Sequence, residues 1–185
     1  MKTLIIAMVG ILTLSSGVHA QSEIEIALTP APSRAQDAAT VIKWNADHSY
    51  ETLREGSNHL VCYDRSDERD RRPFAVQCTH ITNLERVAQN RRFRAQTADG
   101  AEERALITAA EADGTRASVE YGSVWYAAQG PDHASAGIHV TVAVPGATAE
   151  STGFPVTRDF GGIYLMQAGT GGAHLMIPGR DASCA

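Results

Sequence analysis

Residues 54–78, REGSNHLVCYDRSDERDRRPFAVQC, predict a turn, a strand, a charged loop and a second strand. Side chains alternate along a strand, so Leu60 and Cys62 share one face of the first strand, and Val76 and Cys78 share one face of the second. Antiparallel pairing would set the cysteines opposite each other, at a separation that a disulfide tolerates. We therefore predict a Cys62–Cys78 disulfide in a hairpin around which the rest of the chain is arranged.

The two segments that flank the first strand have different expected roles. Residues 66–73, SDERDRRP, are mostly charged, and charged side chains are rarely buried, so we expect this loop to be solvated. Residues 55–58, EGSN, combine residues that tolerate positive φ with residues that bond their own backbone. They therefore predict a turn.

The REGSN turn, followed by Cys62 and then by Cys78 after a polar loop, resembles a family of uncharacterised exported bacterial proteins. That family also tends to have a histidine-bearing strand that ends in proline near the C-terminus, and residues 174–178, HLMIP, match this element. The resemblance covers about half of the chain. It supports a fold and an exported compartment, and it implies no particular reaction.

The N-terminus has the pattern of a secretory signal peptide. Lys2 precedes the apolar stretch 4–14, which is too short to span a bilayer, and Val18 and Ala20 supply the small residues that precede a cleavage site. We predict a signal peptide over residues 1–20 and one domain over residues 21–185. The mature protein should be soluble, free of membrane, and periplasmic or secreted, where a disulfide persists.

Charge and cysteine content limit the partners. The 185-residue chain has a formal net charge of −5, which makes it a poor candidate for binding nucleic acid. Three cysteines leave one without an intramolecular partner. Because Cys184 lies one residue from the end, we expect it to be free or to join two chains in a dimer.

Strand patterns occupy both ends of the mature chain. Residues 23–28, EIEIAL, alternate like an edge strand, and the strands predicted next should form an antiparallel meander with the cysteine hairpin. Beyond the hairpin, β patterns return only in the last third. The predicted strands outside the hairpin and residues 23–28 are 40–44, 49–54, 118–128, 138–144, 162–167 and 173–177.

Two helices are predicted between these groups of strands. The first should begin with a capping box in which Thr82 is the N-cap and Glu85 reaches back. The second should run over residues 99–113, with Ala105, Leu106, Ala109 and Ala110 toward the core. The order of elements favours an α+β fold, an antiparallel sheet with about two helices packed on one face.

Arginines gather at the end of the first predicted helix. Arg91, Arg92 and Arg94 lie where the helix dipole favours cations, so we expect a solvated helix end. Binding of phosphate or of an anionic partner is the alternative.

Two predicted strands carry a histidine at their second position and end at a proline. If they are neighbours, His139 and His174 could hold zinc or copper, with His80, Asp132 or His133 as a third ligand. No HxH or HExxH spacing supports such a site, and a surface histidine bonded to a backbone carbonyl is the simpler interpretation.

No catalytic motif accompanies these histidines. The chain has neither GxSxG nor CxxC. Its aromatic residues, Trp44, Tyr121, Trp125, Tyr126 and Tyr164, are expected to pack in the core, with a ligand groove as the alternative. We therefore expect a non-enzymatic binding or structural module of the periplasm, with an unknown small molecule or protein as partner. The alternative is a metal-dependent enzyme with a site around His139 and His174.

Overall fold

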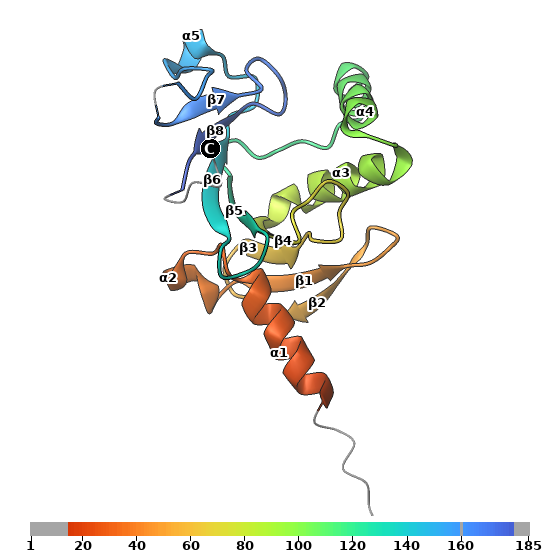
Figure 1. Ribbon diagram of the computed structural model, residues 1–185. Coiled ribbons are helices and arrows are strands. Elements are labelled where there is room, and N and C mark those ends of the chain that lie inside the picture. The colour runs from red at the N-terminus through yellow and green to blue at the C-terminus, as the bar shows by residue number, and fades with distance from the viewer. Residues whose placement is uncertain (1–14, 160, 180–185) are drawn as a thin grey trace, which may run out of the picture.

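A single eight-stranded sheet organises the computed structural model, which describes residues 15–159 and 161–179 (Figure 1). The strand order is β2-β1-β3-β4-β5-β6-β8-β7. Only β1 (Thr40–Trp44) and β3 (Leu60–Asp64) pair in parallel, and the other pairs are antiparallel. The predicted α+β fold class is confirmed.

The strands predicted from residue 40 onward and the two central helices follow the predicted order, whereas the short helices α2 and α5 were not predicted. Three strands of the last third, β5, β7 and β8, are shorter than expected. In particular, β5 begins at Val124 and not at residue 118. The other strands are β2 (Tyr50–Arg54), β4 (Phe74–His80), β5 (Val124–Gly130), β6 (Gly137–Ala143), β7 (Tyr164–Met166) and β8 (His174–Ile177). The helices are α1 (Ser15–Ala27), α2 (Ser33–Gln36), the 3-10 helix η1 (Ile81–Asn83), α3 (Leu84–Gln96), α4 (Gly100–Ala112) and α5 (Ala149–Thr152).

The disulfide lies at the centre of one face of the sheet. Cys62 and Cys78 are directly opposite each other in the β3–β4 pair, with their Cα atoms 4.0 Å apart, and their sulfurs are bonded. Both are fully buried in a cluster that includes Val41 of β1 and Ala27 at the end of α1. The predicted hairpin and its disulfide are confirmed.

Residues 23–28 form the end of α1 and the turn after it, so the prediction of an edge strand was wrong. Ile24, Ala27 and Leu28 recur at helical spacing, and all three pack against the disulfide cluster. Burial of this stripe outweighs the short alternation of Glu23–Ile26. The predicted cleavage site after Ala20 lies within α1, and the apolar stretch 4–14 and Cys184 lie outside the described residues.

The REGSN turn makes the crossover that sets β3 beside β1. The predicted antiparallel meander is wrong here, because β2 turns back along the outer edge and the chain then crosses to the other side of β1. A Cβ on Gly56 would lie 2.3 Å from the carbonyl oxygen of Ala38, so only glycine fits. The N–H groups of Ser57 and Asn58 donate to that same oxygen, and the Arg54 guanidinium donates to the carbonyl of Ala39. The motif therefore has a structural role.

Helix α3 lies over the opposite face of the sheet, and α4 packs beside α3 (Figure 1). Leu84 and Val87 of α3 contact Ile42, Val61 and Tyr63 of the strands. In the described part of the chain, no helix is long and apolar enough to cross a bilayer.

Helix α4 buries less than predicted. Leu106 is half-buried and Ala110 is buried, but Ala105 and Ala109 are exposed. The helix packs along α3 on one side only, so the predicted apolar stripe is wider than the surface that covers it.

The capping box predicted before α3 is wrong. Thr82 lies within η1, and its hydroxyl donates to the carboxylate of Glu120, while Glu85 pairs with Arg92. The 3-10 turn that precedes α3 displaces the start of the helix from the position that the motif indicated.

Candidate functional site: an arginine-lined cavity

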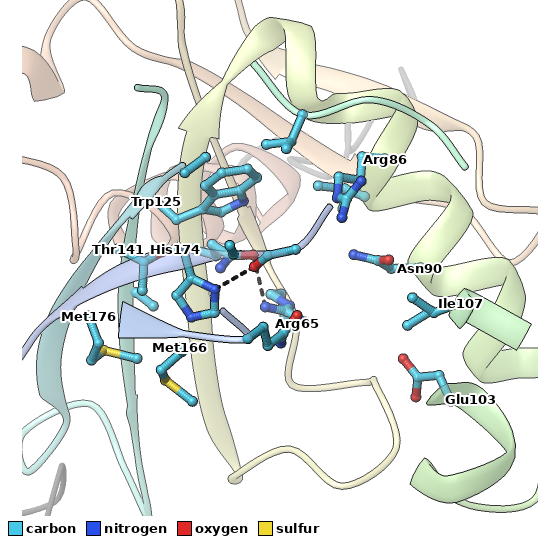
Figure 2. A pocket seen from close by; sticks show the side chains of 18 of the residues that line it. Arg65, Arg86, Asn90, Glu103, Ile107, Trp125, Thr141, Met166, His174 and Met176 are labelled. Atoms are coloured by element: carbon cyan, nitrogen blue, oxygen red, sulfur yellow. Dashed lines mark hydrogen bonds between the residues drawn. The ribbon is translucent and has the colours of Figure 1, made fainter. Parts of the chain in front are cut away.

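A cavity of about 440 Å³ lies between the α3–α4 pair and the adjacent face of the sheet. Strands β4, β5, β6 and β8 supply its floor, and the helices and the β3–β4 loop supply its walls (Figure 2). Its charged and strongly polar lining consists of Arg65, Glu68, Arg71, Gln77, Arg86, Asn90, Arg94, Glu103, Glu111, Arg116, Thr141, His139, His174 and Gln167.

The cavity is positive although the chain is acidic. Five arginines and three glutamates line it, an excess of two positive charges, whereas the whole chain has a formal net charge of −5. Positive charge concentrated in a concave, partly desolvated site attracts small anions. The individual arginines, however, differ in how fully they are neutralised.

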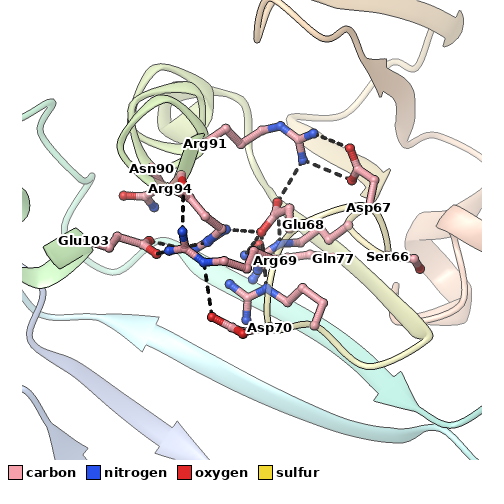
Figure 3. A network of polar contacts seen from close by, with 12 residues as sticks. Ser66, Asp67, Glu68, Arg69, Asp70, Gln77, Asn90, Arg91, Arg94 and Glu103 are labelled. Carbon is pink, nitrogen blue, oxygen red and sulfur yellow. Dashed lines mark hydrogen bonds and ion pairs between the residues drawn. The ribbon is translucent and has the colours of Figure 1, made fainter. Parts of the chain in front are cut away.

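Glu68 is the centre of the first group, which we call the Glu68 network (Figure 3). Its side chain is only 3% exposed and accepts from four guanidinium groups, those of Arg65, Arg71, Arg91 and Arg94. Burial alone would raise the pKa of Glu68, but the hydrogen bond and charge of Arg65, aided by the other arginines, lower it to about 2. Glu68 is therefore ionised at neutral pH.

The arginines of this network are mostly saturated by their partners. Arg65 makes two bonds to Glu68 and donates a third to the side-chain oxygen of Gln77, at 2.8 Å. Burial would lower the pKa of Arg65, but Glu68 more than offsets it and the pKa is raised. Arg94 bonds to Glu68 and, through two nitrogens, to Glu103.

The network corrects two predictions. The β3–β4 loop is not fully solvated, because Glu68 is buried within it. The helix end is not solvated either: Arg91 is buried against Glu68 and Asp67, and Arg92, the most exposed of the three arginines, is half-buried. Opposite charges on the loop and on α3 let both segments bury charge together.

The second group, the Arg86–Arg116 pair, lies at another part of the cavity wall. Arg86 donates to the carbonyls of Ala117 and Gly171, and the nearest carboxylate, that of Glu111, lies 3.9 Å away. Arg116 donates to two amide side chains of α3, and its buried Nε has no hydrogen-bond partner among the described residues. No described carboxylate lies within ion-pair distance of Arg116.

The pKa values of these two arginines follow from this shortage of negative charge. Burial, followed by repulsion from Arg86, lowers the pKa of Arg116 to about 10, although Glu111 and then Glu103 oppose the shift. Burial also lowers the pKa of Arg86. Arg71, at the edge of the Glu68 network, behaves similarly, because burial and repulsion by Arg65 lower its pKa to about 10. All three remain protonated at neutral pH.

His139 and His174 line the same cavity, on the paired strands β6 and β8. His174 is opposite Ala143, so the two histidines are four register positions apart, roughly 13 Å along the strands. His174 Nδ1 lies 2.8 Å from the carbonyl of Gly172, while His139 Nδ1 is buried without a described partner. Burial, and then the charges of His174 and Arg65, lower the pKa of His139.

The predicted third metal ligands are on the other face of the sheet. His80 shares the disulfide face of β4, and His133 stacks against Phe74 of that face and contacts Thr29. Asp132 accepts from Ser135 in the β5–β6 turn. Within residues 15–159 and 161–179, no three His, Cys, Asp or Glu side chains are grouped to hold a metal ion. The zinc or copper site stays a prediction.

The sheet side of the cavity is apolar. Trp125, Met166 and Met176 lie on the strand side, while Arg86 and Asn90 lie on the helix side (Figure 2). The expectation that the aromatic residues serve packing alone is therefore incomplete for Trp125. It is wrong for Tyr121, which is 73% exposed. Arg86 and Arg116 were not predicted as site residues, because neither lies in a motif.

Comparison with protein-family models, with curated proteins and with solved structures found no match to this chain. The resemblance carried by REGSN, the two cysteines and residues 174–178 stays a prediction.

Proposed function

We propose that this protein is an exported, non-enzymatic binding protein that takes a small organic anion into the arginine-lined cavity. The observation that carries the proposal is the Arg86–Arg116 pair, two partly desolvated cations for which Glu111 is the one described carboxylate within ion-pair distance. Export follows from the predicted signal peptide. Mass spectrometry of the exported protein should find a chain that begins at Gln21.

A bound anion would relieve an electrostatic cost that the protein bears when the cavity holds none. Removing a cation from water is unfavourable unless opposite charge and hydrogen bonds replace the water. Guanidinium groups make strong, directional hydrogen bonds to oxyanions such as carboxylates, sulfonates and phosphates. A cavity of about 440 Å³ also lies within the range of small-molecule sites.

A matched pair of ligands tests this function. Naphthalene-2-sulfonate and naphthalene-2-sulfonamide share an aromatic body and differ in charge. The sulfonate should raise the thermal unfolding temperature at millimolar concentration, and the effect should shrink as salt is added. The neutral sulfonamide should have little effect. Equal stabilisation by both compounds, or by neither compound or any other organic anion in a wider panel, would contradict the proposal.

The alternative, a metal-dependent enzyme, keeps one observation in its favour: His139 and His174 face the same cavity. Elemental analysis of purified protein decides this point. Stoichiometric zinc or copper that is lost from His139→Ala and His174→Ala variants would favour the enzyme over the binding protein.

A further inference from the structure

We infer that Arg86 and Arg116 form a headgroup subsite, and that the ligand is an amphipathic organic anion whose apolar body lies against Trp125 and Met176. The inference rests on the proposed function and specifies it further. It names which of the five cavity arginines bind the anion, and what the rest of the ligand must be.

Arg116 is held in place without being neutralised. Its terminal nitrogens donate to the side-chain oxygens of Gln89 and Asn90, and its guanidinium lies 5.7 Å from the centre of the Phe93 ring. These partners are uncharged, so they fix the orientation of the group and leave its charge uncompensated. The buried Nε of Arg116 remains as a donor without a described partner.

Arg86 is held in the same manner, by backbone carbonyls. Its bonds to Ala117 at 2.7 Å and Gly171 at 3.1 Å join α3 to the segment before β5 and to the β7–β8 turn. Among the described residues, Glu111 is the one carboxylate within ion-pair distance of this pair. Glu103 also acts on Arg116 from farther away, but it is bonded to Arg69 and Arg94. Arg86, Arg116 and Glu111 together therefore leave a single uncompensated positive charge, which suits a singly charged head such as a carboxylate or sulfonate.

The Glu68 network is unsuited to this role. Arg65 and Arg94 direct their donors to Glu68, Glu103 and Gln77, so an anion would have to displace bonds that are already made. Breaking a buried ion pair to admit a ligand costs more free energy than bonding the ligand to a guanidinium group that has no carboxylate partner.

The other side of the cavity determines the body of the ligand. Trp125 of β5 and Met176 of β8 present an indole ring and a thioether opposite the helices (Figure 2). Indole rings stack on flat apolar groups, and methionine adapts to irregular ones. A ligand with a charged head at the Arg86–Arg116 pair therefore extends an aromatic or aliphatic body across the floor.

The probe for this arrangement is 1-anilinonaphthalene-8-sulfonate, a fluorescent aromatic sulfonate. The chain has two tryptophans, so a Trp44→Phe background leaves Trp125 as the sole energy donor. Binding should quench Trp125 emission and sensitise the probe. Arg116→Met should weaken binding roughly tenfold or more, the scale of one lost charge-assisted bond.

Arg92→Met is the matched control, because it removes the same charge from a half-exposed position of α3 that does not line the cavity. It should change the dissociation constant by less than about twofold. Glu111→Gln gives an effect of opposite sign: loss of the competing carboxylate should tighten binding several-fold, and this test holds even if Arg116→Met does not fold.

The outcomes separate the inference from the function on which it rests. Equal binding by the Arg116→Met and Arg92→Met variants, or unchanged binding by Glu111→Gln, would overturn the headgroup subsite and leave anion binding intact. Binding without quenching of Trp125 would overturn the placement of the apolar body. If this probe fails to bind while another organic anion still stabilises the protein, the amphipathic ligand is wrong. If no organic anion binds, the proposed function fails too.

Discussion

Two groups of arginines lie at one cavity and differ in how fully their positive charge is neutralised. In the Glu68 network, Arg65, Arg91 and Arg94 meet carboxylates that are themselves buried or half-buried. At the Arg86–Arg116 pair, the close partners are carbonyl and amide oxygens. The first group therefore has the pairing expected of arginines that stabilise the fold, and the second has the unpaired charge expected of a binding site. The number of arginines does not distinguish the two groups. The chemical type of each guanidinium's hydrogen-bond partner does.

The largest expected effect comes from removing the centre of the Glu68 network. Glu68→Gln would leave four guanidinium groups facing one another around a neutral amide. Breaking a buried ion pair in this way typically costs about 3–5 kcal/mol. Urea denaturation should show that loss, and the exposed control Glu85→Gln should lose less than about 1 kcal/mol. Similar losses for both variants would mean that the network contributes no special stability.

Removing the disulfide should weaken the fold and leave the site unchanged. The Cys62→Ser/Cys78→Ser variant should lose about 2–5 kcal/mol, as is typical for small secreted domains. Because the disulfide lies on the face opposite the cavity, the folded variant should bind the naphthalene probe as tightly as the wild type. An altered dissociation constant, measured well below the unfolding temperature, would show that the two faces are coupled.

A smaller effect is expected from acid. The pKa of Glu68 is about 2 in the folded protein and is lower than its ordinary value of 4.5. The stability that ionised Glu68 contributes is therefore complete above the ordinary value and is lost as the pH falls from about 4.5 to about 2. Unfolding free energies measured across this range should fall more steeply for the wild type than for Glu68→Gln. Parallel curves would contradict the assignment.

The hairpin was predictable because the residues that determine it lie close together in the sequence. Alternation around Cys62 and Cys78 is enough to place both on one face, and the polar loop between them favours antiparallel pairing. Helix α1 was missed although Ile24, Ala27 and Leu28 recur at helical spacing. The competing alternation of Glu23–Ile26 is as strong over so short a segment, and only packing against the disulfide decides between them.

The site was not predictable because its members meet only in the folded chain. Arg86, Glu111 and Arg116 come from α3, α4 and the segment after α4, and no spacing in the sequence links them. Of the cluster that the sequence did show, Arg91 and Arg94 are neutralised largely by a loop that was expected to be solvated, and Arg92 pairs with Glu85 of its own helix. Sequence indicates where charges are, and the fold determines which of them remain uncompensated.

The most direct test of the account compares thermal unfolding of the wild type, Arg94→Met and Arg116→Met, each with and without naphthalene-2-sulfonate. Arg94→Met should unfold at a clearly lower temperature and still be stabilised by the sulfonate, because Arg94 belongs to the Glu68 network. Arg116→Met should unfold near or above the wild-type temperature, since it removes an uncompensated, half-buried charge, and should lose the stabilisation by the sulfonate. Equal destabilisation of the two variants, with the sulfonate effect intact in both, would contradict the division of these arginines into structural and binding groups.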